Sequence, residues 1–180
     1  MKEMIIQLVK ERKIGELISL ISMLFAEGFR EDRLEVVKFQ IYDAFKVVGG
    51  LLASRVEEKE AVNALNEYGR GIGMFRSIEY LLPNGSKWHR QMPLILIDQV
   101  IVSEPIDVKV YKILKDSYNL DFNYPRCYLT RGFVHGYFNR FLGGIHLEEQ
   151  SHFQRKGDDF YCKYRILRAK QFNKGGVIII

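Results

Sequence analysis

The chain has 180 residues, of which 47% are hydrophobic and 27% charged, an ordinary composition for a soluble globular protein with one sizeable core. Two cysteines do not make a disulfide framework, and no apolar run approaches the roughly 20 residues that a membrane span needs. The N-terminus carries no signal-peptide pattern, so we expect a cytoplasmic protein. The net charge of +5 comes from residues 151–180, because acidic and basic residues balance over residues 1–150. This basic segment indicates either a solvated strand face and tail or a contact with phosphate or an acidic partner.

The first 57 residues have the pattern of amphipathic helices. Apolar residues recur at helical spacing over residues 14–25. A second helix is predicted to begin at Asp32, which resembles the start of a capping box, and Gly49-Gly50 is expected to interrupt or end it. We interpret residues 1–57 as a helical extension that contributes to a homodimer interface.

Residues 58–82 also have a helical pattern, with Gly69 and Gly73 four positions apart. Glycine in a helix interior costs about 1 kcal/mol relative to alanine, so packing or ligand access is expected to explain the pair. Close packing of another backbone is the simpler of these two interpretations.

The middle of the chain is predicted to be mainly strand and loop. A turn at Pro83–Ser86 leads to Trp88, the single tryptophan, which lies either in a lid over a pocket or in a surface loop with a half-buried indole. Residues 94–102 are rich in strand-forming side chains. A turn at residues 103–105 and a half-exposed strand over residues 106–110 follow.

The stretch between the two cysteines is predicted to be a helix followed by two strands. Cys127 falls in the first turn of the helix, and Gly143-Gly144 ends it, because glycine readily takes the left-handed conformation at a helix C-terminus. Ile145 begins the first strand, and a turn over residues 156–159 leads to the second. The side chains expected on one face of the second strand are those of Phe160, Cys162, Tyr164 and Ile166.

Four residues of this stretch form a candidate metal site: Cys127, Glu149, His152 and Cys162. Two thiolates, a carboxylate and an imidazole suit a tetrahedral zinc ion. The alternative is that both cysteines are small buried core residues. Residues 149 and 152 lie on opposite faces of a regular strand, so a shared metal also requires the strand to end or bulge near Gln150.

Arg131 is a second candidate functional residue. It lies one helical turn after Cys127, close to the apolar face of the predicted helix. A cation at this position extends to water, pairs with a carboxylate or meets an acidic ligand.

Motifs of common enzymes are absent from the sequence. It has no phosphate loop, dinucleotide fingerprint, nucleophile elbow or His-Glu-x-x-His helix, so catalysis has little support. Nucleic-acid binding through residues 155–174 remains an alternative, although no recognisable nucleic-acid motif supports it.

The stretch from Cys127 to Tyr164 contains a cysteine that opens a helix, a strand that carries Glu149, a Gly-Asp turn and a second cysteine followed two residues later by an aromatic residue. The positions of this pattern are Cys127, Gly132, Gly136, Gly143, Glu149, Gly157, Asp158, Cys162 and Tyr164. The pattern resembles the C-terminal half of the vinyl-4-reductase domain family, whose members are often called predicted hydrocarbon-binding proteins. That family has a third cysteine between these two, at the position of His152 here; histidine can also ligate zinc, and the turn after it is one residue longer in this chain. Residues 64–73 resemble the family's glycine-containing helix, so the likeness covers residues 58–167.

This resemblance implies an α+β fold of helices packed on one side of a small antiparallel sheet. The family's relatives include aromatic-sensing domains of transcription activators and subunits of a Golgi transport complex. The likeness also implies a homodimer and an apolar pocket between helices and sheet, within residues 58–180. The residues expected to line that pocket are Tyr68, Ile72, Phe75, Arg131, Val134 and Phe138.

Two functions follow as expectations. The first is a sensory domain that binds a hydrophobic or aromatic small molecule, has a structural zinc site and acts through a partner protein. The second is a reductase-like or accessory protein in cofactor or pigment biosynthesis, which turnover of a substrate would distinguish from the first.

Overall fold

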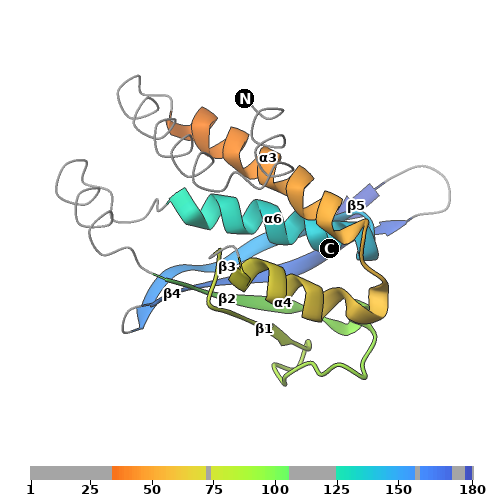
Figure 1. The fold of residues 1–180 in the computed structure, drawn as a ribbon. Coiled ribbons are helices and arrows are strands. Elements are labelled where there is room, and N and C mark those ends of the chain that lie inside the picture. The colour runs from red at the N-terminus through yellow and green to blue at the C-terminus, as the bar shows by residue number, and fades with distance from the viewer. Residues whose placement is uncertain (1–33, 72–73, 106–124, 157–158, 172–176, 180) are drawn as a thin grey trace.

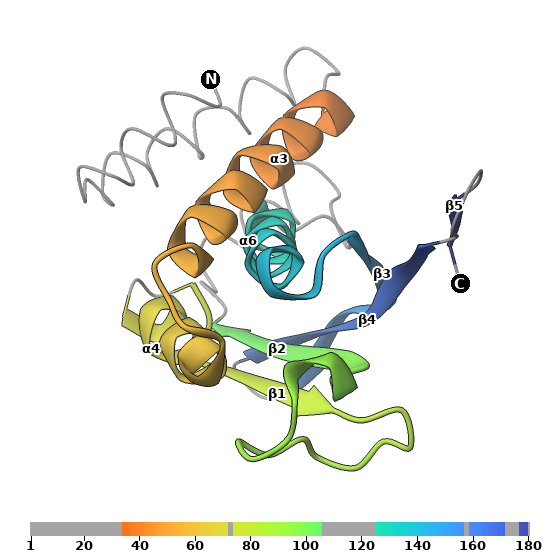
Figure 2. The ribbon, with the colours of Figure 1, turned by 90° about the vertical axis from the view of Figure 1, so that its right-hand side faces the viewer.

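The structure, a computed structural model, describes residues 34–71, 74–105, 125–156, 159–171 and 177–179. Helix α3 (Leu34–Ala53) packs on α6 (Pro125–Leu142), and α6 in turn lies between α3 and a β-sheet (Figure 1, Figure 2). The helices predicted within residues 1–33 and the strand predicted over residues 106–110 lie outside the described residues. The remaining elements are η1 (Glu58–Glu60), α4 (Ala61–Gly71), β1 (Ser77–Leu81), η2 (Leu94–Leu96), β2 (Gln99–Pro105), β3 (Ile145–Lys156), β4 (Asp159–Gln171) and β5 (Val177–Ile179).

The sheet is antiparallel throughout, with strand order β1-β2-β4-β3. Helices α3, α4 and α6 lie on the same side of it (Figure 2), which confirms the predicted α+β class. Strand β5 pairs with the end of β4, so the apolar residues near the C-terminus extend the sheet. The sheet residues that are buried beneath the helices are Ile78, Tyr80, Val100, Val102, Ile145, Leu147, Cys162, Tyr164 and Ile166.

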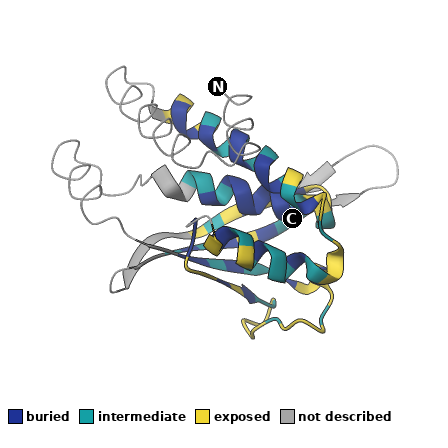
Figure 3. Ribbon diagram, in the orientation of Figure 1, coloured by how far each residue is buried: buried dark blue, intermediate teal, exposed yellow. Residues whose placement is uncertain are grey.

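Helices α3 and α6 approach closely because glycines lie where they cross. A methyl group added at Gly136 would lie 1.7 Å from the carbonyl oxygen of Lys46, and one at Gly49 would lie 2.0 Å from that of Phe133. The prediction that Gly49-Gly50 interrupts or ends the helix is wrong, since α3 continues to Ala53. Packing against α6 offsets the low helix propensity of these glycines. Buried residues accordingly run along both helices (Figure 3).

The helix predicted over residues 58–82 is shorter than expected. Helix α4 ends at Gly71, and β1 begins six residues later at Ser77. Ile78 and Tyr80 are buried and alternate with exposed residues, because β1 pairs with β2 at the sheet edge. Gly69 contacts the ring of Phe75 rather than another backbone, since an added methyl group would lie 2.1 Å from that ring.

The following region differs from its prediction in two details. Residues 94–96 form the 3-10 helix η2, and β2 begins only at Gln99. The expected turn at residues 103–105 is wrong, because β2 continues through Pro105 in register with β4. Trp88 is half-buried in the surface loop before η2, which agrees with the second of its two interpretations.

The end of α6 is as predicted. Gly143 and Gly144 have φ angles of 64° and 54°, and the N–H of Gly143 donates to the carbonyl oxygen of Asn139 at 3.0 Å. The Asn139 side chain then accepts a hydrogen bond from the N–H of Ile145 at 3.1 Å. The turn therefore directs the chain from α6 straight into β3.

Candidate functional site

Helix α6 is attached to β3 through Arg131. Its guanidinium donates to the carbonyl oxygen of Leu147 at 2.8 Å and lies 3.4 Å from the carboxylate of Glu149. Both charged side chains are partly buried. Of the three interpretations of Arg131, pairing with a carboxylate is the one observed. The contact links one predicted ligand-binding residue to one predicted zinc ligand.

The other predicted ligand-binding residues form part of the core beneath α6. Val134 and Phe138 are fully buried, and Phe75 is nearly so. Tyr68 is half-buried at the edge of α4, where its ring stacks on Phe133 with centroids 6.0 Å apart. The sixth, Ile72, lies outside the described residues. The described members thus belong to, or lie beside, one layer of aromatic side chains between α4, α6 and the sheet. This aromatic layer consists of Tyr68, Phe75, Tyr80, Phe133, Tyr137 and Phe138.

Several hydroxyl groups lie inside this layer. Tyr137 donates to the carbonyl oxygen of Ala61 at 2.5 Å, and Tyr80 donates to the side-chain oxygen of Asn66 at 3.3 Å. Burial raises the pKa of both phenols, so they stay protonated as donors.

The hydroxyl of Thr130 differs from these phenols. The side chain is completely buried, yet Oγ1 has no hydrogen-bond partner among the described residues. The Nε of the adjacent Arg131 is likewise buried, and no described residue accepts a hydrogen bond from it. A buried polar group left unpaired costs about 1–3 kcal/mol, so two on one turn of a helix need an explanation.

The four predicted zinc ligands come from neighbouring segments of backbone. Cys127 falls in the first turn of α6, one turn before the residue that contacts Glu149. The β3–β4 ladder shifts register between Glu149 and Ser151 and again between Ser151 and Gln154. This irregularity near Gln150 meets the condition that a metal shared by residues 149 and 152 would impose on the strand.

Two of these ligands have described side chains. Cys162 is a buried cysteine on β4, and the carboxylate of Glu149 already lies beside Arg131. The side chains of Cys127 and His152 lie outside the description. Among the described residues, no group of three or more His, Cys, Asp or Glu side chains could hold a metal ion. The mixture of two thiolates, an imidazole and a carboxylate fits zinc by its chemistry.

His135 forms a buried link between three elements. Tyr42 of α3 hydrogen-bonds to its Nδ1, and its Nε2 lies 2.9 Å from the carbonyl oxygen of Ile145. A carbonyl only accepts, so Nε2 carries the proton and Nδ1 accepts from the tyrosine hydroxyl. Burial, with Lys46 as the next cause, lowers the pKa of His135 to about 4, which keeps the ring neutral at pH 7.

Comparisons with protein-family models, curated proteins and solved structures found no match to this chain. The vinyl-4-reductase resemblance therefore remains an expectation drawn from the residues that carry it. Within the part of the chain that the structure describes, no helix is both long enough and apolar enough to cross a bilayer.

Sequence reasoning missed Tyr42 and His135. The two residues are 93 positions apart, and neither belongs to a recognisable motif. The available signal was a lone histidine between Val134 and Gly136 in an apolar helix, which usually indicates a buried histidine with satisfied ring nitrogens. Thr130 carried a similar signal, as a hydroxyl on the same face as Val134.

Proposed function

We propose that the protein binds a small hydrophobic or aromatic molecule between α4, α6 and the sheet, and signals its presence through a partner protein. The observation that carries this proposal is the Thr130 hydroxyl of α6, which is buried and has no hydrogen-bond partner among the described residues. The fold expected from the vinyl-4-reductase resemblance, with helices on one side of an antiparallel sheet, also supports it.

The chemistry of α6 favours a ligand with an oxygen acceptor. Thr130 Oγ1 and Arg131 Nε can both donate, and Val134 and Phe138 of the same helix are buried and apolar. Binding sites for small molecules are mostly apolar with a few placed polar groups. A phenol or an aromatic acid would satisfy the donors and bury its ring.

The test uses 4-methylphenol with the wild type and Thr130→Val. Valine has the shape of threonine without the hydroxyl, so we expect the variant to be as stable as the wild type or slightly more stable. A concentration of 100 times the Kd stabilises a binding protein by about 2.7 kcal/mol. We therefore expect 4-methylphenol to raise the melting temperature of the wild type, and to raise that of the variant less.

The proposal fails if neither 4-methylphenol nor benzoate raises the melting temperature of the wild type and native mass spectrometry finds no bound small molecule. Equal shifts in wild type and variant would remove Thr130 from the site. Conversion of the ligand to a product would instead favour the reductase-like alternative.

The zinc site belongs to the same proposal. Cys127, Glu149, His152 and Cys162 would hold the ion with four protein ligands, which leaves no open position and makes the role structural. The ion would join the first turn of α6 to β3 and β4. Two cysteines do not make a disulfide framework, which suits a reducing compartment, so we place the protein in the cytoplasm.

A further inference from the structure

A groove of about 420 Å³ lies between the start of α4 and the loop before η2, a size usual for small-molecule sites. It is lined by different residues from those of the proposed core site. Its apolar wall includes Val62, Met92 and Trp88. The full lining consists of Glu58, Lys59, Val62, Asn63, Trp88, Arg90, Gln91, Met92, Pro93 and Leu94.

The indole of Trp88 is held in a fixed position. Its Nε1–H donates to the carbonyl oxygen of Pro93 at 3.1 Å, and its ring makes an edge contact with Tyr80 at 6.0 Å between centroids. The indole donor is therefore already used. What Trp88 can still offer a ligand is its apolar ring and the negative electrostatic face of that ring.

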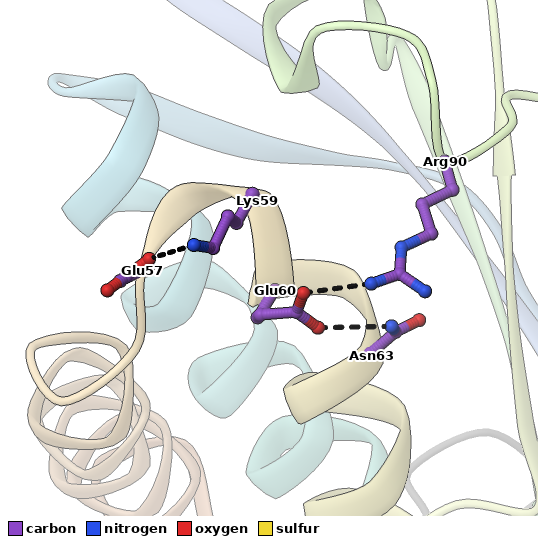
Figure 4. Close-up of polar contacts among 5 residues, drawn as sticks. All are labelled: Glu57, Lys59, Glu60, Asn63 and Arg90. Carbon is purple, nitrogen blue, oxygen red and sulfur yellow. Dashed lines mark hydrogen bonds and ion pairs between the residues drawn. The ribbon is translucent and has the colours of Figure 1, made fainter.

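Both cations of the groove are already paired with carboxylates. Lys59 lies 2.7 Å from Glu57, and Arg90 lies 2.8 Å from Glu60, whose other oxygen accepts from Asn63 at 3.3 Å (Figure 4). Glu58 differs, since its carboxylate has no ion-pair or hydrogen-bond partner among the described residues. The unpaired charge of the lining is therefore negative.

We propose that this groove binds a small organic ammonium ion. The cation lies against the Trp88 ring and the Glu58 carboxylate, and the apolar part of the ligand contacts Val62 and Met92. Cations over an indole are attracted by its quadrupole, and tryptophan gives the strongest such contact. An anionic ligand would meet Glu58 unfavourably and would have to compete with Glu60 for Arg90.

Trp88 is the single tryptophan of the chain and lines this groove, so its fluorescence reports on a ligand bound there. The probes are 2-phenylethylamine, an ammonium ion at pH 7, and 3-phenylpropionate, a carboxylate of similar shape, at equal ionic strength. We expect a saturable change with the amine, at a Kd of about 1 mM for so small a ligand. We expect the carboxylate to bind in this groove about tenfold more weakly or not at all. Because an aromatic acid is also a ligand of the proposed core site, the two probes are compared in Thr130→Val, which lacks the hydroxyl of that site.

Two glutamate variants give the matched comparison. Glu58→Gln should weaken binding of the amine about fivefold, as expected for an ion pair near the surface. Glu67→Gln removes the same charge from an exposed position of α4 outside the lining and should leave the affinity unchanged. Thr130→Val should also leave it unchanged, which separates this site from the proposed core ligand.

The proposal is overturned if 2-phenylethylamine gives no saturable signal or if 3-phenylpropionate binds equally well. Equal affinities of wild type and Glu58→Gln would overturn it too. Isothermal titration with Trp88→Phe provides a second measurement, in which retention of full affinity would exclude the indole contact.

Discussion

Tyr42 of α3 donates a hydrogen bond to Nδ1 of His135 on α6, and His135 in turn donates through Nε2 to the backbone of β3 at Ile145. One imidazole thus joins both helices to the sheet. The ring is almost completely buried and makes a hydrogen bond through each nitrogen. Its protonation would remove the acceptor that Tyr42 uses, so the state of this ring is coupled to the stability of the fold.

The first prediction is that stability falls between pH 6.5 and pH 4. The pKa of His135 is about 4 in the folded protein and 6.5 in the unfolded chain, so only the unfolded state takes up the proton in this range. The stabilisation is fully present above pH 6.5 and is lost as the pH falls to 4. A shift of this size corresponds to about 3 kcal/mol.

Urea unfolding at several pH values measures this effect. The groups that surround the ring are Tyr42, Lys46, Arg131 and His146, and His135→Gln should flatten the dependence while these remain. His89→Gln changes an exposed histidine and should retain the wild-type slope. A wild-type slope in His135→Gln would contradict the assignment.

The second prediction concerns the crossing of α3 and α6. Gly136→Ala would place a methyl group 1.7 Å from the carbonyl oxygen of Lys46, which the backbone of α3 cannot avoid without moving. Overpacking of this kind costs about 2–3 kcal/mol. Gly50→Ala is the matched control, since its nearest contact is an ordinary 3.6 Å and alanine favours helix by about 1 kcal/mol. Chemical unfolding should therefore show opposite signs for the two variants, and a neutral Gly136→Ala would disprove the close approach.

Local patterns were enough to predict one part of this fold. The helix that contains Cys127, its end at Gly143, and the burial of Cys162, Tyr164 and Ile166 all follow from periodicity and glycine conformation. The irregularity near Gln150 could not be predicted in this way, because the sequence showed only that a metal shared by residues 149 and 152 would require it.

Tertiary contacts decided what local patterns could not. The pair Gly49-Gly50 predicts a helix end from the sequence alone. In the structure α3 continues past it, because the backbone of α6 packs closely against Gly49 and stabilises the helix there. The sequence of residues 77–81 fits a helical pattern. In the structure these residues pair with β2 and therefore alternate between the two faces of the sheet. In the candidate site, Arg131 had three possible environments, and only the position of β3 selects Glu149 as its partner.

The third prediction tests the zinc site with two histidines of β3. His152→Ala should lose the metal and lower the melting temperature, because a structural zinc stabilises the folded chain directly. His146→Ala removes an exposed histidine of the same strand and should keep both metal and stability. Elemental analysis and melting with and without a chelator measure the two effects. Cys162→Ser should also lose the metal and lower the melting temperature. If the wild-type protein contains no metal even after zinc supplementation, the two cysteines are only core residues.

The last prediction is that α3 takes part in a homodimer. The side chain of Phe39 is 69% exposed, and Val36 on the same helix is 54% exposed. A large aromatic at such exposure is unfavourable in water and suits an interface between two copies with twofold symmetry. We therefore expect sedimentation to give twice the chain mass of 21.1 kDa for the wild type and the single mass for Phe39→Asp.

Ile95→Asp changes an exposed apolar residue of η2, away from α3, and should remain dimeric. A wild type that sediments as a monomer at tens of micromolar would exclude the dimer, because an obligate interface of about 2,000 Å² persists at that concentration.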